Sequence, residues 1–273
     1  TLRIAKGAKV DASAAPVTKT SLDGYRNETQ ATVSGNPGQV YLSFADRLEL
    51  DGRISAQATW LSGRGGELTV TNSEIGNDWA LANADFEPWI EGGFDAITLL
   101  SYSDLIFDGK ISASVGRSLV IDAPRIVAGD DANISLSAPW VRLMNTYYGD
   151  SDTLSETGGG RFSLAGEWID LVGDLQLSGF DRAYLLADSD LRVSDFDYQN
   201  GKASGQTGYK GWSGRFSHSG DLVTAGRIVA EVPSDVAELA AITIGDGESS
   251  DDFSPVFAAD FTFDVDGKIT TLQ

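Results

Sequence analysis

Cysteine is absent from this chain of 273 residues, which excludes disulfides and thiolate metal sites. The absence identifies no compartment, although it is compatible with large proteins that are exported unfolded across two membranes. The only histidine is His218, and the sequence has no Gly-x-Ser-x-Gly segment. A Ser–His–Asp triad and zinc or iron sites with several His or Cys ligands are therefore excluded, and we expect His218 to be solvated.

Long apolar runs and basic runs are also missing. No stretch approaches the roughly 18 apolar residues of a membrane span. Lys and Arg number 20 against 40 Asp and Glu, so the net charge of -20 repels phosphate backbones and anionic headgroups. We expect no nucleic-acid partner and no membrane insertion. The apolar share of 41% is still enough to bury a substantial core.

Helical spacing is scarce, because apolar residues at i, i+3 and i+4 are sustained nowhere for three turns. Only Pro233 to Ala241 favours a helix, with Ser234 as its N-cap, so we expect at most one short helix. The chain begins TLRIAKGAKV, without an initiator Met or the pattern of a signal peptide. We expect it to be an internal segment of a longer protein.

Internal repeats are the strongest positive signal. Residues 48–56 align without gaps on residues 105–113, and six of the nine positions are identical. The reduced pattern, two apolar pairs around a glycine, returns from Ile169, Leu222 and Phe263. Alternation with period two predicts short half-buried strands. The glycine between them predicts a corner where φ is positive or a Cβ would collide.

Two architectures remain open at this point. Asp-Gly at 51–52, 108–109 and 266–267 is typical of tight hairpins, which keeps a sandwich or barrel as the alternative. One short motif that recurs with irregular insertions favours an all-β right-handed parallel β-helix, a single segment over residues 1–273. Its interior would then be lined by one column of apolar side chains, namely Leu50, Phe107, Ile111, Leu119, Ile121, Leu136, Leu164 and Leu171.

Several phrases resemble those of the filamentous-haemagglutinin family, large adhesins exported by two-partner secretion in Gram-negative bacteria. They are Gly-Ala-Lys-Val-Asp-Ala-Ser at 7–13, the two Asp-Gly-x-Ile-Ser-Ala copies, and residues 159–180. The resemblance covers most of the chain up to about residue 227. It implies a β-helix shaft, export through an outer-membrane pore partner, and a place in the medium or at the cell surface. The family's amino-terminal secretion domain is not visible, Asn36-Pro37 being only a fragment of its signals.

Four long excursions from the repeat are the expected sites of recognition, near 77–93, 145–160, 198–220 and 245–254. The segment 77–93 is predicted to be an inserted packing loop. Exposed aromatic residues in loops stack on sugar rings, and the candidates are Tyr147, Tyr148, Tyr209 and Trp212. The alternative is that these rings pack their own loops. Trp60, Trp89, Trp140 and Trp168 are expected to cover or fill the core.

Acidic clusters raise two further hypotheses. Calcium prefers oxygen ligands, which the densest cluster would supply: Asp246, Glu248, Asp251 and Asp252. We favour solvated negative charge there and expect no cofactor, with calcium as the alternative. Paired carboxylates also serve glycoside chemistry. The pairs are Asp188 with Asp190, Asp195 with Asp197, Asp150 with Asp152, and Asp130 with Asp131.

The expected function is a non-catalytic adhesin shaft that mediates attachment or biofilm interaction. Its partners would be a glycan, a matrix polymer or a cell-surface receptor, bound through loops and side faces. The alternative is a polysaccharide-acting enzyme of the lyase, glycosidase or tailspike kind, and an inert spacer is the third hypothesis.

Overall fold

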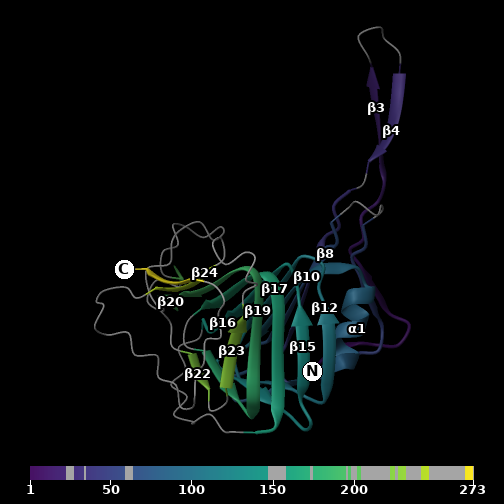
Figure 1. The fold of residues 1–273 in the computed structure, drawn as a ribbon. Coiled ribbons are helices and arrows are strands. Elements are labelled where there is room, and N and C mark those ends of the chain that lie inside the picture. The colour runs from purple at the N-terminus through teal and green to yellow at the C-terminus, as the bar shows by residue number, and fades with distance from the viewer. Residues whose placement is uncertain are drawn as a thin grey trace.

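The computed structural model describes residues 1–22, 28–33, 35–58, 64–146, 158–172, 175–194, 196–197, 202–203, 222–224, 227–231, 241–245 and 268–272. Within these ranges the protein is mostly β, with one α-helix, and its largest sheet is curled and parallel throughout (Figure 1). The twelve strands of this sheet are β5 (Gln39–Phe44), β8 (Gly66–Asn72), β10 (Phe94–Ser101), β12 (Lys110–Ser114), β13 (Ser118–Asp122), β15 (Asn133–Ser137), β16 (Trp140–Met144), β17 (Gly160–Val172), β19 (Phe180–Ser194), β23 (Arg227–Glu231), β24 (Ala241–Gly245) and β25 (Lys268–Leu272).

The remaining strands form smaller sheets. A parallel five-stranded sheet contains β9 (Trp79–Leu81), β11 (Leu105–Phe107), β14 (Ile126–Ala128), β18 (Leu175–Ser178) and β22 (Leu222–Thr224). Two parallel pairs join β1 (Leu2–Ile4) to β6 (Leu48–Leu50) and β2 (Lys9–Asp11) to β7 (Arg53–Ser55). The antiparallel pairs are β3 (Val17–Leu22) with β4 (Glu28–Val33), which projects from the body in Figure 1, and β20 (Phe196–Asp197) with β21 (Lys202–Ala203).

Successive passes of the chain pair in register with one another, which aligns their inward side chains. One such ladder lies entirely in the core and consists of Leu42, Val70, Leu99, Ile121, Leu143 and Leu171. The long strands β17 and β19 each pair with two shorter strands along one edge. The first half of β17 pairs with β15 and its second half with β16, and the first half of β19 pairs with β23 and its second half with β24. Through the double pairing of β17, the pair β12–β15 and the series from β5 to β16 belong to one sheet.

The predicted interior residues lie where the alternation placed them. Phe107, Ile111, Leu119, Ile121, Leu136, Leu164 and Leu171 are all at most 3% exposed, and Leu50 is partly buried against the same cluster. Three phenylalanines bridge the interior, with ring centroids 6.0 Å apart for Phe107 and Phe162 and 5.3 Å apart for Phe162 and Phe180. Parallel strands that bury one apolar face against another element account for this core.

The hairpin interpretation of Asp-Gly is wrong at the two copies that the structure describes. The strands on either side of Gly52 pair with β1 and β2, and those on either side of Gly109 pair with β9, β14 and β15. Both reasons for a corner glycine are present, one at each copy. Gly109 has φ +68°, whereas a Cβ on Gly52 would lie 2.7 Å from the carbonyl oxygens of Ala5 and Ala8.

The segment 77–93, predicted to be a loop, contains strand β9 and the helix α1 (Asn83–Glu91). The Asp85 carboxylate accepts a hydrogen bond from the Ala82 N–H at 2.8 Å, and the fully buried rings of Phe86 and Trp89 anchor the helix to the core. With nine residues and Pro88 inside it, α1 is too short for a sustained helical pattern. The helix predicted over 233–241 falls outside the described residues except Ala241, which begins β24.

Helix α1 lies beside the edge of β12 that β15 does not occupy. The Asn83 Oδ1 accepts a hydrogen bond from the Ser112 N–H at 3.0 Å, as a neighbouring strand's carbonyl would. The helix also contacts β7, so it separates the β2–β7 pair from the strands that follow β12. Within the described residues, α1 is the only helix, and no helix there has the length and apolarity to span a membrane.

Candidate functional site

Most of the predicted site residues fall outside the part of the chain that the structure describes. This holds for the aromatic candidates Tyr147, Tyr148, Tyr209 and Trp212, for the acidic cluster Asp246, Glu248, Asp251 and Asp252, and for His218. It also holds for Asp150, Asp152 and Asp195. Among the described residues, no group of three or more His, Cys, Asp or Glu side chains is arranged to hold a metal ion.

The described acidic candidates lie in one turn and in two strands. Asp130 and Asp131 are exposed at the turn before β15, and Asp131 has φ 51°, a left-handed backbone that Asp tolerates better than most residues. Asp188 is exposed in β19, and Asp190 and Asp197 lie in β19 and β20. Asp188 also shares a pocket with a carboxylate that the sequence analysis did not single out.

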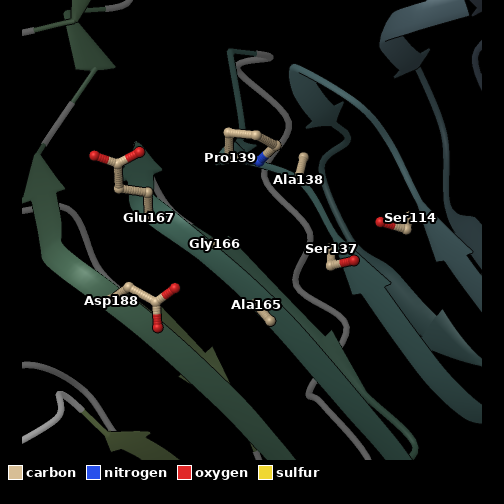
Figure 2. Close-up of a pocket in the computed structure, with 8 residues that line it drawn as sticks. All are labelled: Ser114, Ser137, Ala138, Pro139, Ala165, Gly166, Glu167 and Asp188. Carbon is tan, nitrogen blue, oxygen red and sulfur yellow. The ribbon is translucent and has the colours of Figure 1, made fainter.

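That carboxylate is Glu167, which lines the same open pocket of about 390 Å³ as Asp188 (Figure 2). The two residues come from the adjacent strands β17 and β19, next to an irregularity in their pairing between Gly166 and Trp168. The other pocket residues are small: Ser114, Ser137, Ala138, Pro139, Ala165 and Gly166. Figure 2 shows Glu167 and Asp188 on one side of the pocket and the two serines on the other.

The pocket lies at one end of the outer surface of β12, β15, β17 and β19, which we call the outer face. Ile111, Ile134 and Phe162 point into the core. Successive side chains of a strand point to opposite faces, so the residues on either side of each of these three point outward. In-register pairing stacks these outward positions in columns. The middle column carries hydroxyl groups and consists of Ser112, Ser135, Ser163 and Tyr184.

Two tryptophans lie just beyond the pocket, where the chain continues into β16 and the second half of β17. Trp168 is 39% exposed, so it does not fill the core, whereas Trp89 is fully buried as expected; Trp60 lies outside the described residues. Trp140 is half-buried, and its indole N–H donates a 2.6 Å hydrogen bond to the fully buried Asp170 carboxylate. The Arg142 guanidinium lies 4.4 Å from the centre of the Trp140 ring, which holds that ring in place.

Ion pairs organise the neighbouring strands. Arg117 donates hydrogen bonds of 3.0 Å to both Asp95 and Glu67. Burial alone would lower the pKa of Arg117, but these two carboxylates outweigh burial and raise it. At Asp122, burial raises the pKa of the carboxyl even though Thr146 donates hydrogen bonds to both of its oxygens. These side chains secure strands rather than lining the pocket.

The sequence does contain a pattern that indicates the outer face, although the predicted loop aromatics do not include it. Three strands share the same polar and apolar alternation: β12 is Lys-Ile-Ser-Ala-Ser, β15 is Asn-Ile-Ser-Leu-Ser, and β17 has Arg-Phe-Ser-Leu-Ala directly after its first residue. Only the pairing register brings these three phrases side by side. No protein-family model, curated protein or solved structure matches this chain.

Proposed function

We propose that this chain is a segment of a right-handed parallel β-helix, and that it serves as the non-catalytic shaft of a secreted or cell-surface adhesin. The observation that carries the proposal is the in-register parallel pairing of successive passes from β5 to β25. Each pass buries apolar residues against its neighbours and needs no distant segment. Parallel crossover connections are right-handed in nearly all proteins, which supports the choice of hand.

A shaft of this kind offers flat outer surfaces rather than a closed active site. Its interior is occupied by aliphatic and aromatic side chains, so a ligand contacts the outward columns and the connections between strands. Serine hydroxyls and the exposed Trp168 suit contacts with the hydroxyl groups and ring faces of sugars. We therefore propose a glycan, a matrix polymer or a glycosylated receptor as the partner.

The proposed location rests on the phrases that resemble exported adhesins. By that resemblance the longer protein would leave a Gram-negative cell through an outer-membrane pore and act in the medium or at the surface. The absence of cysteine is compatible with that route, because no disulfide could form before passage. Calcium binding by the acidic cluster at 246–252 remains a separate hypothesis, which calorimetric titration of the chain with CaCl₂ tests directly.

Binding of the purified chain to a panel of neutral and acidic glycans and matrix extracts tests the adhesin proposal. Release of new reducing ends or unsaturated products is recorded in the same samples. We expect retention on at least one polymer and no product. Absence of binding throughout the panel would favour the inert spacer.

The alternative of a polysaccharide-acting enzyme is favoured by one observation, the shared pocket of Glu167 and Asp188. Glycoside hydrolysis uses two carboxyl groups that flank the scissile bond, whereas Glu167 and Asp188 lie on the same side of the pocket (Figure 2). The pocket is open and both side chains are exposed, so water is not excluded from it. The test compares Glu167→Gln/Asp188→Asn with the control Glu74→Gln/Glu91→Gln, which removes two exposed carboxylates elsewhere. If turnover disappears in the first variant and persists in the control, the enzyme replaces the adhesin proposal.

A further inference from the structure

Basic residues gather in one register column that begins on the outer face and continues onto β23, although the chain is strongly acidic. The column runs across β12, β15, β17, β19 and β23, and its members are Lys110, Asn133, Arg161, Arg182 and Arg227, which we call the basic column. Lys and Arg make up only 20 of 273 residues, yet they occupy four of these five positions. Composition alone does not produce such a column.

A second pair of basic positions lies in the separate β2–β7 sheet, which α1 also contacts. There Lys9 of β2 pairs in register with Arg53 of β7, and Arg53 occupies the place in the sequence repeat that Lys110 occupies in its second copy. Helix α1 contacts both β7 and β12, so it lies between the two sets of basic positions. Lys9 forms an ion pair with Asp11, which leaves the basic column on the far side of α1 as the stronger positive strip.

The described side chains of the basic column are open to solvent. Lys110, Asn133 and Arg161 are exposed, and within the described part of the chain neither Lys110 nor Arg161 makes an ion pair. Like charges at directly opposed positions of neighbouring strands repel each other. Neighbouring strands lie about 4.8 Å apart, so the five positions span about 19 Å. Asn133 separates Lys110 from Arg161, whereas Arg161, Arg182 and Arg227 hold directly opposed register positions, so an anionic chain laid along the column would relieve the repulsion from Arg161 onward.

The neighbouring columns indicate which anionic chain fits. Beside the basic column runs the hydroxyl column of Ser112, Ser135, Ser163 and Tyr184, whose groups donate to and accept from sugar hydroxyls. Exposed carboxylates precede these strands, Asp108 before β12 and Asp130 and Asp131 at the turn before β15, and their charge would repel an anion from that end of the strands. Single-stranded nucleic acid needs several aromatic rings for base stacking, and Tyr184 is the one aromatic residue in these two columns of the described residues.

We propose that the outer face binds an acidic polysaccharide, a uronate or sulfated glycan, extended along the basic column and across the strands. The inference rests on the proposed adhesin function and names the ligand class and the face that recognises it. Guanidinium groups pair bidentately with carboxylates and sulfates, and the hydroxyl column contacts the uncharged parts of the sugar. Trp168 and the pocket of Glu167 and Asp188 lie at the far end of this surface.

Binding of the purified chain to polygalacturonate, dextran sulfate, uncharged dextran and poly(dT) tests the inference by biolayer interferometry. Lys110→Ser/Arg161→Ser removes two charges of the column, and Lys6→Ser/Arg64→Ser removes two exposed charges elsewhere. We expect the first variant to weaken binding to an acidic polymer by roughly tenfold or more, because it loses two charge-assisted contacts, and the control by less than about twofold. Circular dichroism checks that both variants fold.

Two further readouts sharpen the result. Affinity for oligogalacturonates should rise with their length until the oligomer spans about 19 Å. Binding should be lost in 1 M NaCl, because salt at that concentration screens charges that lie more than about 3 Å apart. Equal affinities of the two double variants, or tighter binding of poly(dT) than of either acidic glycan, would overturn the inference. Binding of neutral glycans alone would overturn it while leaving the adhesin proposal intact. A chain that binds no glycan at all would remove both.

Discussion

The two copies of the Asp-Gly repeat make a stability prediction that depends on backbone geometry. At Gly109 the backbone has φ +68° and no atom lies within 4 Å of the position of an added Cβ. Gly109→Ala should therefore lower the free energy of unfolding by about 1–2 kcal/mol, the cost of a left-handed conformation for an L-residue. Asn tolerates that conformation, so Gly109→Asn should recover most of the loss.

Gly52 should respond in the opposite order. Its φ is not positive, but an added Cβ would lie 2.7 Å from two carbonyl oxygens and from Ile4 Cγ2. The backbone oxygens cannot rotate away, so Gly52→Ala should cost about 3 kcal/mol, the upper end of the range for overpacking. Gly52→Asn adds further atoms in the same place and should cost more than Ala.

Urea unfolding followed by circular dichroism measures all four variants, with the slope m compared first so that only stability changes are interpreted. The expected order of stability is Asn above Ala at 109 and Ala above Asn at 52. The same order at both positions would refute the geometric explanation, because it would mean that one property of glycine serves both copies.

Three further predictions concern two buried side chains and one half-buried arginine. Phe162→Ala should lower the free energy of unfolding by about 3–5 kcal/mol, because the ring is fully buried between two aromatic neighbours 6.0 and 5.3 Å away; Phe162→Leu should recover at least half of this loss in the same urea titration. Burial raises the pKa of Asp122 above its ordinary 3.8, so its contribution to stability falls as pH rises from that value through the folded-state pKa. The melting temperature of Asp122→Asn relative to that of the parent should therefore be higher at pH 7 than at pH 4. An equal difference at both pH values would contradict a raised pKa of Asp122. Arg117→Met should destabilise the fold by about 1–3 kcal/mol because it leaves two carboxylates without their shared donor, and Arg117→Lys, which cannot reproduce the fork, should recover only part of this in thermal unfolding.

Sequence reasoning predicted single candidate residues, but not the surface over which we propose that recognition is spread. The aromatic candidates and the densest acidic cluster came from the long excursions, and all of these residues lie outside the described ranges. Asp188 was singled out, but Glu167 was not, since 21 positions separate the two residues along the chain. Their common pocket exists only because Gly166 pairs in register with Ala187. No spacing along the sequence indicates that Glu167 and Asp188 are neighbours.

The alternation of apolar and polar residues determined by itself that the chain is mostly β and which side chains enter the core, because successive side chains of a strand point to opposite faces. The repeat also determined that glycine stands at a corner, and the strands around Gly52 and Gly109 bear this out. Which strands become neighbours is a different matter. Pairing depends on the lengths of the connections and on packing between passes, so only the tertiary structure placed α1 beside β12 and lined up Lys110 with Arg161 across Asn133.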